Sequence, residues 1–163
     1  MIDFATFYSA LKQQLAPLDK TNTLMVGIHT GGYWLAEALH ADLGFTQPLA
    51  ALSTTLQRDD FATSGLHKQR QPTRLPMSLQ GVNVLLVDDV LHTGRTMRAA
   101  LNELFEYGRP ASVRLAVLAD RGGRELPFAA SYCGGVVDVP KNHELVLLQT
   151  DQGLGLSMEA KSL

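Results

Sequence analysis

A chain of 163 residues and 17.7 kDa has the length of about one domain. Its 45% hydrophobic and 18% charged residues exclude wholesale disorder, and a single cysteine, Cys133, excludes an internal disulfide and a cysteine-based zinc site. No apolar run approaches the roughly 20 residues that cross a bilayer, and no basic run precedes an apolar segment near Met1. We therefore expect a cytoplasmic protein with no membrane partner.

The formal net charge is −2, which argues against a general nucleic-acid coat protein. The distribution of cations is uneven, because twelve of the 14 lysines and arginines lie from Arg58 onward. We expect any site for a polyanion to lie mostly in the second two-thirds of the chain.

Helices and strands are predicted to alternate along the chain. Apolar residues at helical spacing predict helices over Asp3–Gln14 (capped by Asp3 and ended by Pro17), Tyr33–Leu43 and Gly94–Tyr107. Short apolar runs predict strands over Thr23–Ile28, Leu49–Leu56, Val82–Val87, Val113–Ala119, Phe128–Tyr132 and Glu144–Leu148. From Gln57 to about Gln80 no periodicity survives, so this stretch is either a misassigned segment or a functional lid.

The strands read as nearly continuous apolar runs, which is typical of a mostly parallel sheet covered by helices on both faces. The predicted fold class is therefore α/β. Ligands of such sheets bind beyond the carboxyl ends of the strands. Three loops qualify, and they are His29–Gly32, Asp88–Arg95 and Asp120–Pro127.

The segment Val84–Thr96 reads VLLVDDVLHTGRT and carries the clearest chemistry. Backbone N–H groups of its Thr-Gly-Arg-Thr turn, with the hydroxyls of Thr93 and Thr96 at a helix entry, can cradle a phosphate. Asp88 and Asp89 can accept hydrogen bonds from two vicinal hydroxyls or hold the water shell of Mg²⁺. This combination fits a ribose 5-phosphate, whereas the plainer alternative is a strand-end pair that caps the next helix. The glycine spacing matches neither a P-loop nor a dinucleotide fingerprint.

The same segment resembles the phosphoribosyl-diphosphate (PRPP) binding motif of type I phosphoribosyltransferases. Four stretches together, in the same order and spacing, resemble the PyrR family of pyrimidine-operon regulators and uracil phosphoribosyltransferases. These are Gly27–Ala36, Leu56–Asp60, the PRPP motif and Gly108–Pro127.

The resemblance implies a reaction, a fold and an assembly. The reaction converts uracil and PRPP to UMP and pyrophosphate with Mg²⁺, which Asp88 and Asp89 hold indirectly through PRPP. The fold is a single type I phosphoribosyltransferase domain over residues 1–163, with a mobile loop at about 58–80 and a small hood after residue 127. The assembly is a homodimer or a larger homo-oligomer.

The resemblance also implies roles for individual residues. Thr30 and Gly31 form the pyrophosphate loop, Arg121 binds pyrophosphate or the nucleotide, and Arg58 is the catalytic cation of the closing loop. The PRPP site comprises Asp88, Asp89, Val90, Leu91, His92, Thr93, Gly94, Arg95 and Thr96. We expect Lys68, Arg70 and Arg74 to be solvated loop charges and Arg124–Glu125 to form a local ion pair.

Two positions depart from the family pattern. Gly31 stands where the family usually carries arginine, so a cation is missing or comes from elsewhere. His92 stands where the family commonly has tyrosine and where phosphoribosyltransferases of 6-oxopurines usually have aspartate, which disfavours a purine substrate. We interpret His92 as a residue that lines the site, with a role as catalytic base as the alternative.

Two other functions remain open from the sequence. One is an RNA-binding attenuation regulator that uses the PRPP and UMP site as a sensor, and the other is a phosphoribosyltransferase for another base. In the family the RNA face draws on basic residues of the N-terminal helix, but here Lys12 is the only cation of that helix. We therefore expect weak or no binding to leader mRNA.

Overall fold

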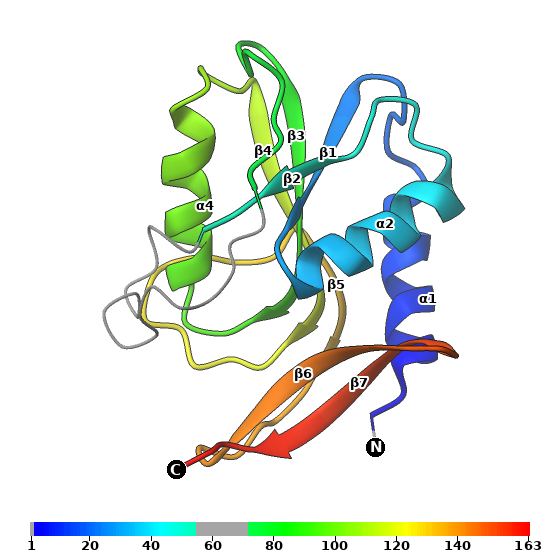
Figure 1. Ribbon diagram of the computed structural model, residues 1–163, viewed down its shortest axis with the longest axis vertical. Helices are drawn as coiled ribbons and strands as arrows, with labels where there is room; N and C mark the ends of the chain where they lie inside the picture. Colours follow the sequence, from blue (N-terminus) through cyan, green and yellow to red (C-terminus); the bar gives the residue numbers. More distant parts are fainter. Residues whose placement is uncertain (1, 55–71) are drawn as a thin grey trace.

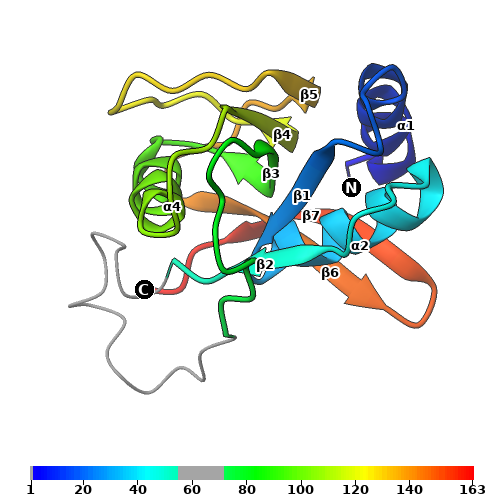
Figure 2. The ribbon, with the colours of Figure 1, turned by 90° about the horizontal axis from the view of Figure 1, so that it is seen from above.

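The computed structural model describes residues 2–54 and 72–163, and its centre is a five-stranded sheet (Figures 1 and 2). The strand order is β2-β1-β3-β4-β5, and every neighbouring pair is parallel, as predicted. The strands are β1 (Thr23–Ile28), β2 (Ala50–Leu52), β3 (Asn83–Leu91), β4 (Ser112–Asp120) and β5 (Tyr132–Val136).

Helices cover both faces of this sheet. Helices α1 (Phe4–Leu15) and α2 (Gly31–Leu43) lie on one face, and α4 (Arg95–Phe105) lies on the other (Figure 2). Successive residues of β1 point to opposite faces, so that Met25 joins the core under α1 and α2 while Leu24 and Val26 join the core under α4. Two buried cores explain why the strands are apolar without alternation.

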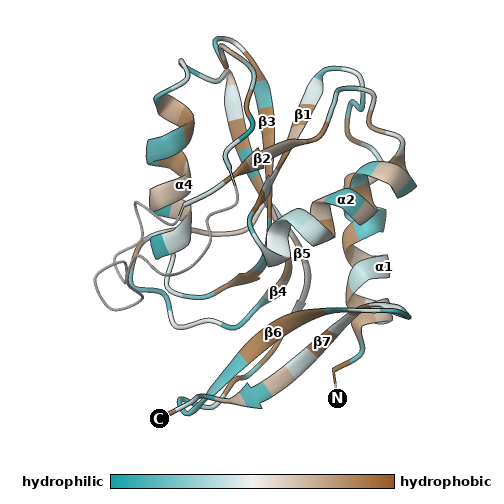
Figure 3. Ribbon diagram, in the orientation of Figure 1, coloured by the Kyte–Doolittle hydropathy of each residue, from teal (hydrophilic) through white to brown (hydrophobic). Residues whose placement is uncertain are grey.

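An antiparallel hairpin of β6 (His143–Thr150) and β7 (Gly153–Ala160) forms a second, smaller sheet. Its buried residues Leu145, Leu147 and Leu156 pack into the core shared by α1 and α2. The hairpin is hydrophobic along its middle and hydrophilic at the end near the C-terminus (Figure 3). Within the described parts of the chain, no helix combines the length and the apolar character needed to cross a membrane.

Several predicted elements are confirmed. Strand β1 has the predicted bounds, and the side chain of Asp3 caps α1 by accepting a hydrogen bond from the backbone N–H of Thr6 at 3.2 Å. The strand predicted over Leu49–Leu56 is shorter in the structure, where β2 covers Ala50–Leu52. Residues 55–56 lie outside the described residues.

Other expectations are wrong. Strand β3 runs four residues beyond Val87, so Asp88 and Asp89 lie within the strand and not after it, because pairing with β4 continues as far as Leu91. The strand predicted over Phe128–Tyr132 instead begins at Tyr132 and contains two glycines. An added Cβ at Gly134 would lie 2.5 Å from the carbonyl oxygens of Phe7 and Leu118, so this strand needs glycine where α1 packs on it.

The turn between β1 and α2 packs so closely on β3 that glycine is required there. A Cβ built at Gly32 would lie 2.6 Å from the carbonyl oxygen of Val87 and 2.9 Å from the Cα of Asp88. Both contacts are with backbone, which cannot move aside without displacing β3. This packing brings the start of α2 against the middle of the sheet.

We expect Gly32→Ala to lower the free energy of unfolding by about 1–3 kcal/mol through overpacking. Urea unfolding measures the change. Gly155→Ala in β7 is the matched control, since a Cβ there meets nothing within 4 Å. Equal losses in the two variants would contradict the close packing described above.

Candidate functional site

Three of the predicted site loops meet at the carboxyl edge of the sheet. The neighbouring strands β1, β3 and β4 are parallel, so the loops that follow them lie side by side (Figure 1). These loops carry Thr30 and Gly31, the Thr93–Thr96 turn, and Arg121. Arg58 lies outside the described residues, as do Lys68, Arg70 and most of the predicted closing loop.

Asp88 and Asp89 are held by the backbone that follows each of them. Asp88 is buried, with 6% of its surface exposed, and its Oδ1 accepts a hydrogen bond from the Asp89 N–H at 2.9 Å. Asp89 Oδ1 accepts one from the Val90 N–H at 2.8 Å. Each carboxylate therefore has a fixed direction before any ligand arrives.

The carboxylate of Asp89 fills the space in which a side chain at Gly31 would begin. A Cβ at Gly31 would contact Asp89 Oδ2 and lie 2.8 Å from its Cγ. A longer side chain, such as the arginine usual in the resembled family, does not fit while Asp89 keeps this position. At Gly31, therefore, a carboxylate and not a cation lies closest to the turn.

The turn that leads into α4 has the geometry of a phosphate cradle. Gly94 precedes the helix with φ +94°, a conformation that favours glycine, and α4 begins at Arg95. The hydroxyl of Thr93 accepts a hydrogen bond from the Arg95 N–H at 3.2 Å. N–H groups at a helix N-terminus attract anions. By contrast, Val90 and Leu91 pack into the two cores, so only their backbone can take part in a site.

A single side chain, Arg124, ties together three segments around the site. Its guanidinium donates to Asp120 Oδ2 at 2.6 Å, to the carbonyl oxygen of His92 at 2.9 Å and to that of Phe128 at 2.8 Å. The expected Arg124–Glu125 ion pair is wrong, because Glu125 pairs instead with Arg95 at 2.8 Å. The sequence reasoning missed this role, although arginine four residues after a strand-end aspartate was a visible signal.

The Thr93–Thr96 turn is held by backbone hydrogen bonds as well. The carbonyl oxygen of Thr93 accepts hydrogen bonds from the N–H groups of Glu125 and Leu126, both at 2.9 Å. A Cβ at Gly94 would lie 3.2 Å from the carbonyl oxygen of Leu126. The segment after β4 therefore forms a wall beside the Thr93–Thr96 turn.

Two titratable groups beside this wall, Asp120 and His92, have shifted pKa values. The hydrogen bond from Arg124 lowers the pKa of Asp120, with a further contribution from the Gly122 N–H. Burial lowers the pKa of His92, and the positive charges of Arg121 and Lys161 lower it further. A neutral His92 packed beside Gly123 is consistent with a lining role.

One side-chain donor of Arg121 finds no acceptor in the part of the chain that the structure describes. Its backbone N–H donates to the Leu91 carbonyl oxygen at 3.0 Å, which fixes the residue at the edge of the sheet. Its Nε is buried and has no hydrogen-bond partner among the residues that the structure describes. A buried donor without a partner is costly, so it is a natural contact for a ligand oxygen.

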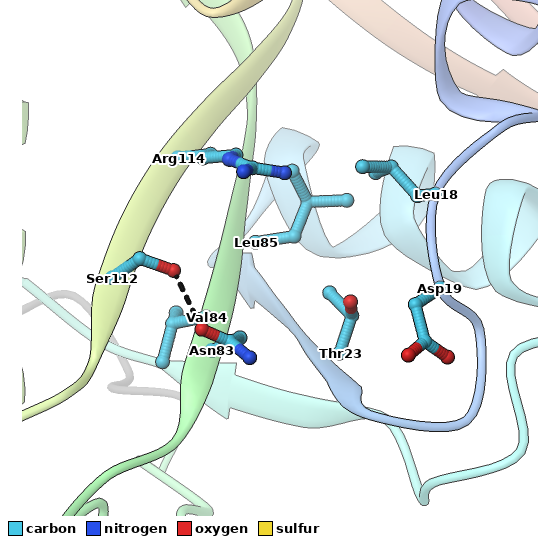
Figure 4. A pocket seen from close by; sticks show the side chains of 8 residues that line it. All are labelled: Leu18, Asp19, Thr23, Asn83, Val84, Leu85, Ser112 and Arg114. Carbon is cyan, nitrogen blue, oxygen red and sulfur yellow. Dashed lines mark hydrogen bonds between the residues drawn. The ribbon is translucent and has the colours of Figure 1, made fainter.

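A separate cavity of about 210 Å³ lies at the opposite edge of the sheet, where β1, β3 and β4 begin (Figure 4). Its polar wall includes Asn83, whose Oδ1 accepts a hydrogen bond from the Ser112 hydroxyl at 2.9 Å. It contains none of the predicted site residues, and ligands of parallel sheets bind at the other edge.

Comparison with known proteins gives one consistent result. Residues 5–147 match the family model of the phosphoribosyl transferase domain. The chain is 47% identical to the Bifunctional protein PyrR of Nitrosococcus oceani over 91% of this chain and 85% of that one. It is also 47% identical to the Bifunctional protein PyrR of Ralstonia nicotianae, over 93% of this chain and 89% of that one.

Solved structures agree on the fold. A hypoxanthine-guanine phosphoribosyltransferase from Bacillus anthracis superposes with a TM-score of 0.66 at 15% identity, covering 86% of this chain and 82% of that one. A purine phosphoribosyltransferase from Pyrococcus horikoshii gives 0.60 at 21% identity, covering 81% and 80%. At these identities the similarity shows the fold alone.

We expect Arg124→Gln to lower the free energy of unfolding at pH 7 by about 1–3 kcal/mol, the range for a lost hydrogen bond to a charged group. Because the folded pKa of Asp120 is lowered, its part of this stabilisation is complete above the unfolded value of about 3.9. That part is lost as the pH falls through the folded pKa. The difference in the free energy of unfolding between variant and wild type should therefore narrow below about pH 4.

Urea unfolding at several pH values between 7 and 3 measures this gap. The matched control is Arg109→Gln, since Arg109 is exposed and enters no ion pair among the described residues. A gap for Arg124→Gln that stays constant down to pH 3 would show that Asp120 does not depend on Arg124.

Proposed function

The chain belongs to the phosphoribosyltransferases, and within them to the PyrR family, and from this premise we propose that it is a uracil phosphoribosyltransferase. It converts uracil and PRPP to UMP and pyrophosphate. One observation carries the proposal: the Asp88–Asp89 pair in β3 lies directly against Gly31 of the β1–α2 turn and precedes the Gly94 turn into α4. A carboxylate pair that can bind two vicinal hydroxyls, a phosphate-binding turn and a glycine loop thus meet at one edge of the sheet.

Each part of this edge has a proposed role. Asp88 and Asp89 accept hydrogen bonds from the two ribose hydroxyls of PRPP. The backbone and hydroxyls of the Thr93–Thr96 turn hold the 5-phosphate at the N-terminus of α4. Thr30 and Gly31 approach the pyrophosphate, and the buried Nε of Arg121 donates to pyrophosphate or nucleotide.

The donor set fits Mg²⁺ brought in with PRPP. Within residues 2–54 and 72–163, no three or more metal-ligating side chains cluster together, so there is no dedicated protein cage. Mg²⁺ usually keeps several waters and binds through one or two carboxylates and substrate phosphates, which Asp88 and Asp89 can supply. When bound, the ion neutralises charge on the departing pyrophosphate.

The reaction breaks the bond between ribose C1 and pyrophosphate, forms a bond from C1 to N1 of uracil, and releases the N1 proton. Negative charge grows on pyrophosphate as it leaves, so fixed donors at this edge favour the transition state. Arg58 is proposed to add a cation from the closing loop. A neutral His92, where a purine enzyme has a carboxylate, supports a pyrimidine substrate.

We also propose that residues 1–163 work as one catalytic unit. The β6–β7 hairpin follows residue 127 and packs on the core that supports α2, which suits the predicted hood. A homodimer or larger homo-oligomer, expected from the family resemblance, stays a prediction.

We expect the purified protein, assayed with PRPP and Mg²⁺, to form UMP from uracil and little product from guanine, hypoxanthine or orotate. The Asp88→Asn, Asp89→Asn double variant is the control: its amide oxygens keep the backbone contacts, but it loses the carboxylates. It should unfold like the wild type while binding PRPP at least about tenfold more weakly. Turnover of purines without turnover of uracil would overturn the assignment.

The second candidate function is RNA-dependent regulation, which the word "bifunctional" in the names of the relatives favours. Lys12, the only cation of α1, lies 5.4 Å from the Tyr8 ring and 3.9 Å from Asp42, so its charge is partly engaged. We therefore expect weak or no binding of a leader hairpin in a gel shift at moderate salt. Tight binding stimulated by UMP would contradict this and favour the regulator.

A further inference from the structure

Three side chains form a stack beside the first turn of α2. The rings of His29 and Tyr33 lie 4.6 Å apart between centroids, with an angle of 30° between their planes. The guanidinium of Arg74 lies 5.5 Å from the centroid of the same Tyr33 ring and donates a hydrogen bond to the Tyr33 hydroxyl at 2.7 Å. The stack therefore joins the end of β1, the start of α2 and a distant segment.

The backbone of Arg74 is fixed to the sheet. Its N–H donates to the Ala51 carbonyl oxygen at 2.8 Å, and its own carbonyl oxygen accepts from the Ala51 N–H at 3.0 Å. Next to it, the Thr73 hydroxyl accepts from the Ser53 N–H at 3.0 Å. Arg74 is exposed, as expected of a loop charge, but both its backbone and its guanidinium have defined partners.

No carboxylate of the described residues balances the charge of Arg74. Among the residues that the structure describes, none forms an ion pair with it. His29, stacked on the same Tyr33 ring, has a pKa lowered by burial and by the nearby charge of Arg74, so it adds no positive charge at pH 7. The stack therefore carries one net positive charge, on Arg74.

This charge lies beside Tyr33 in the first turn of α2, where the helix itself also favours an anion. The N-terminus of α2 carries the positive end of the helix dipole. The turn itself offers no cation, since Thr30, Gly31 and Gly32 are uncharged and Asp89 occupies the space beside Gly31. The Arg74 guanidinium and the positive end of α2 repel each other, and an anionic ligand beside them would relieve this repulsion.

We propose that Arg74 supplies the cation of this turn and binds the diphosphate group of PRPP, and of pyrophosphate as it leaves. Tyr33 is the positioning residue: its ring and hydroxyl hold the guanidinium on the first turn of α2. A guanidinium has five N–H donors, so the bond to Tyr33 leaves others for phosphate oxygens. The inference rests on the proposed function, because it names the residue that binds one part of its substrate.

The experiment separates the two ends of PRPP. Calorimetric titrations with pyrophosphate and with ribose 5-phosphate, both in Mg²⁺ buffer, use wild type, Arg74→Ala, Tyr33→Phe and the remote control Arg109→Ala. We expect Arg74→Ala to weaken pyrophosphate binding about tenfold or more and to leave ribose 5-phosphate unchanged. Tyr33→Phe keeps the ring, so its affinity for pyrophosphate should lie between those of the wild type and Arg74→Ala. Arg109→Ala should bind pyrophosphate as the wild type does. In turnover, Arg74→Ala should raise KM for PRPP without changing KM for uracil.

The outcomes distinguish the inference from the function beneath it. If Arg74→Ala binds pyrophosphate as the wild type does while the wild type turns over PRPP, the inference is overturned and the function stands. If the wild type binds pyrophosphate through Arg74 but neither binds ribose 5-phosphate nor uses PRPP, the anion site stands and the proposed function falls. Equal weakening of both ligands by Arg74→Ala would mean a general structural effect and would also overturn the inference.

Discussion

The close approach of the β1–α2 turn to β3 is the constraint on which the rest of the site depends. Gly32 allows this approach, because a Cβ there would meet the backbone of Val87 and Asp88. It sets Asp89 against Gly31, so that a carboxylate pair and the N-terminus of a helix share one edge. The turn itself, Thr30–Gly31–Gly32, carries no basic side chain. Any cation that serves this turn must therefore reach it from another segment.

The second half of the site is fixed by a different device, which is a network of charged hydrogen bonds. Arg124 connects the end of β4, the PRPP turn and the segment after it through Asp120 and the carbonyl oxygens of His92 and Phe128. Donors and dipoles that are fixed before the reaction do not have to reorganise as charge develops. The three hydrogen bonds of Arg124 all go to this framework, so its structural role is to position the backbone around the site.

Local pattern predicted the elements that local sequence determines. The apolar run of β1, the Asp3 cap and the carboxylate pair of the PRPP segment were all readable from the sequence. The continuation of β3 through Asp88 was not, because it depends on pairing with β4. Strand β5 was misplaced because its glycines are required by the packing of α1. Asp120 lies only four residues before Arg124, but His92 and the Tyr33 partner of Arg74 lie too far along the chain for a spacing rule. The fold class and the loops of the site were thus predictable, whereas the long-range partners of the arginines were not.

The partners of the arginines divide the positive charge of this edge into two kinds. Arg95 and Arg124 are each paired with a carboxylate, Glu125 and Asp120, so they stiffen the site and add little net field. Arg74 and the buried Nε of Arg121 have no acidic partner among the described residues. An anionic ligand gains most from charges that folding has left unneutralised, because it does not have to compete with a carboxylate of the protein. Arg95 and Arg121 both follow strands at this edge of the sheet. They differ in the charge that they can offer a ligand, because the fold gives a counter-ion to Arg95 and none among the described residues to Arg121.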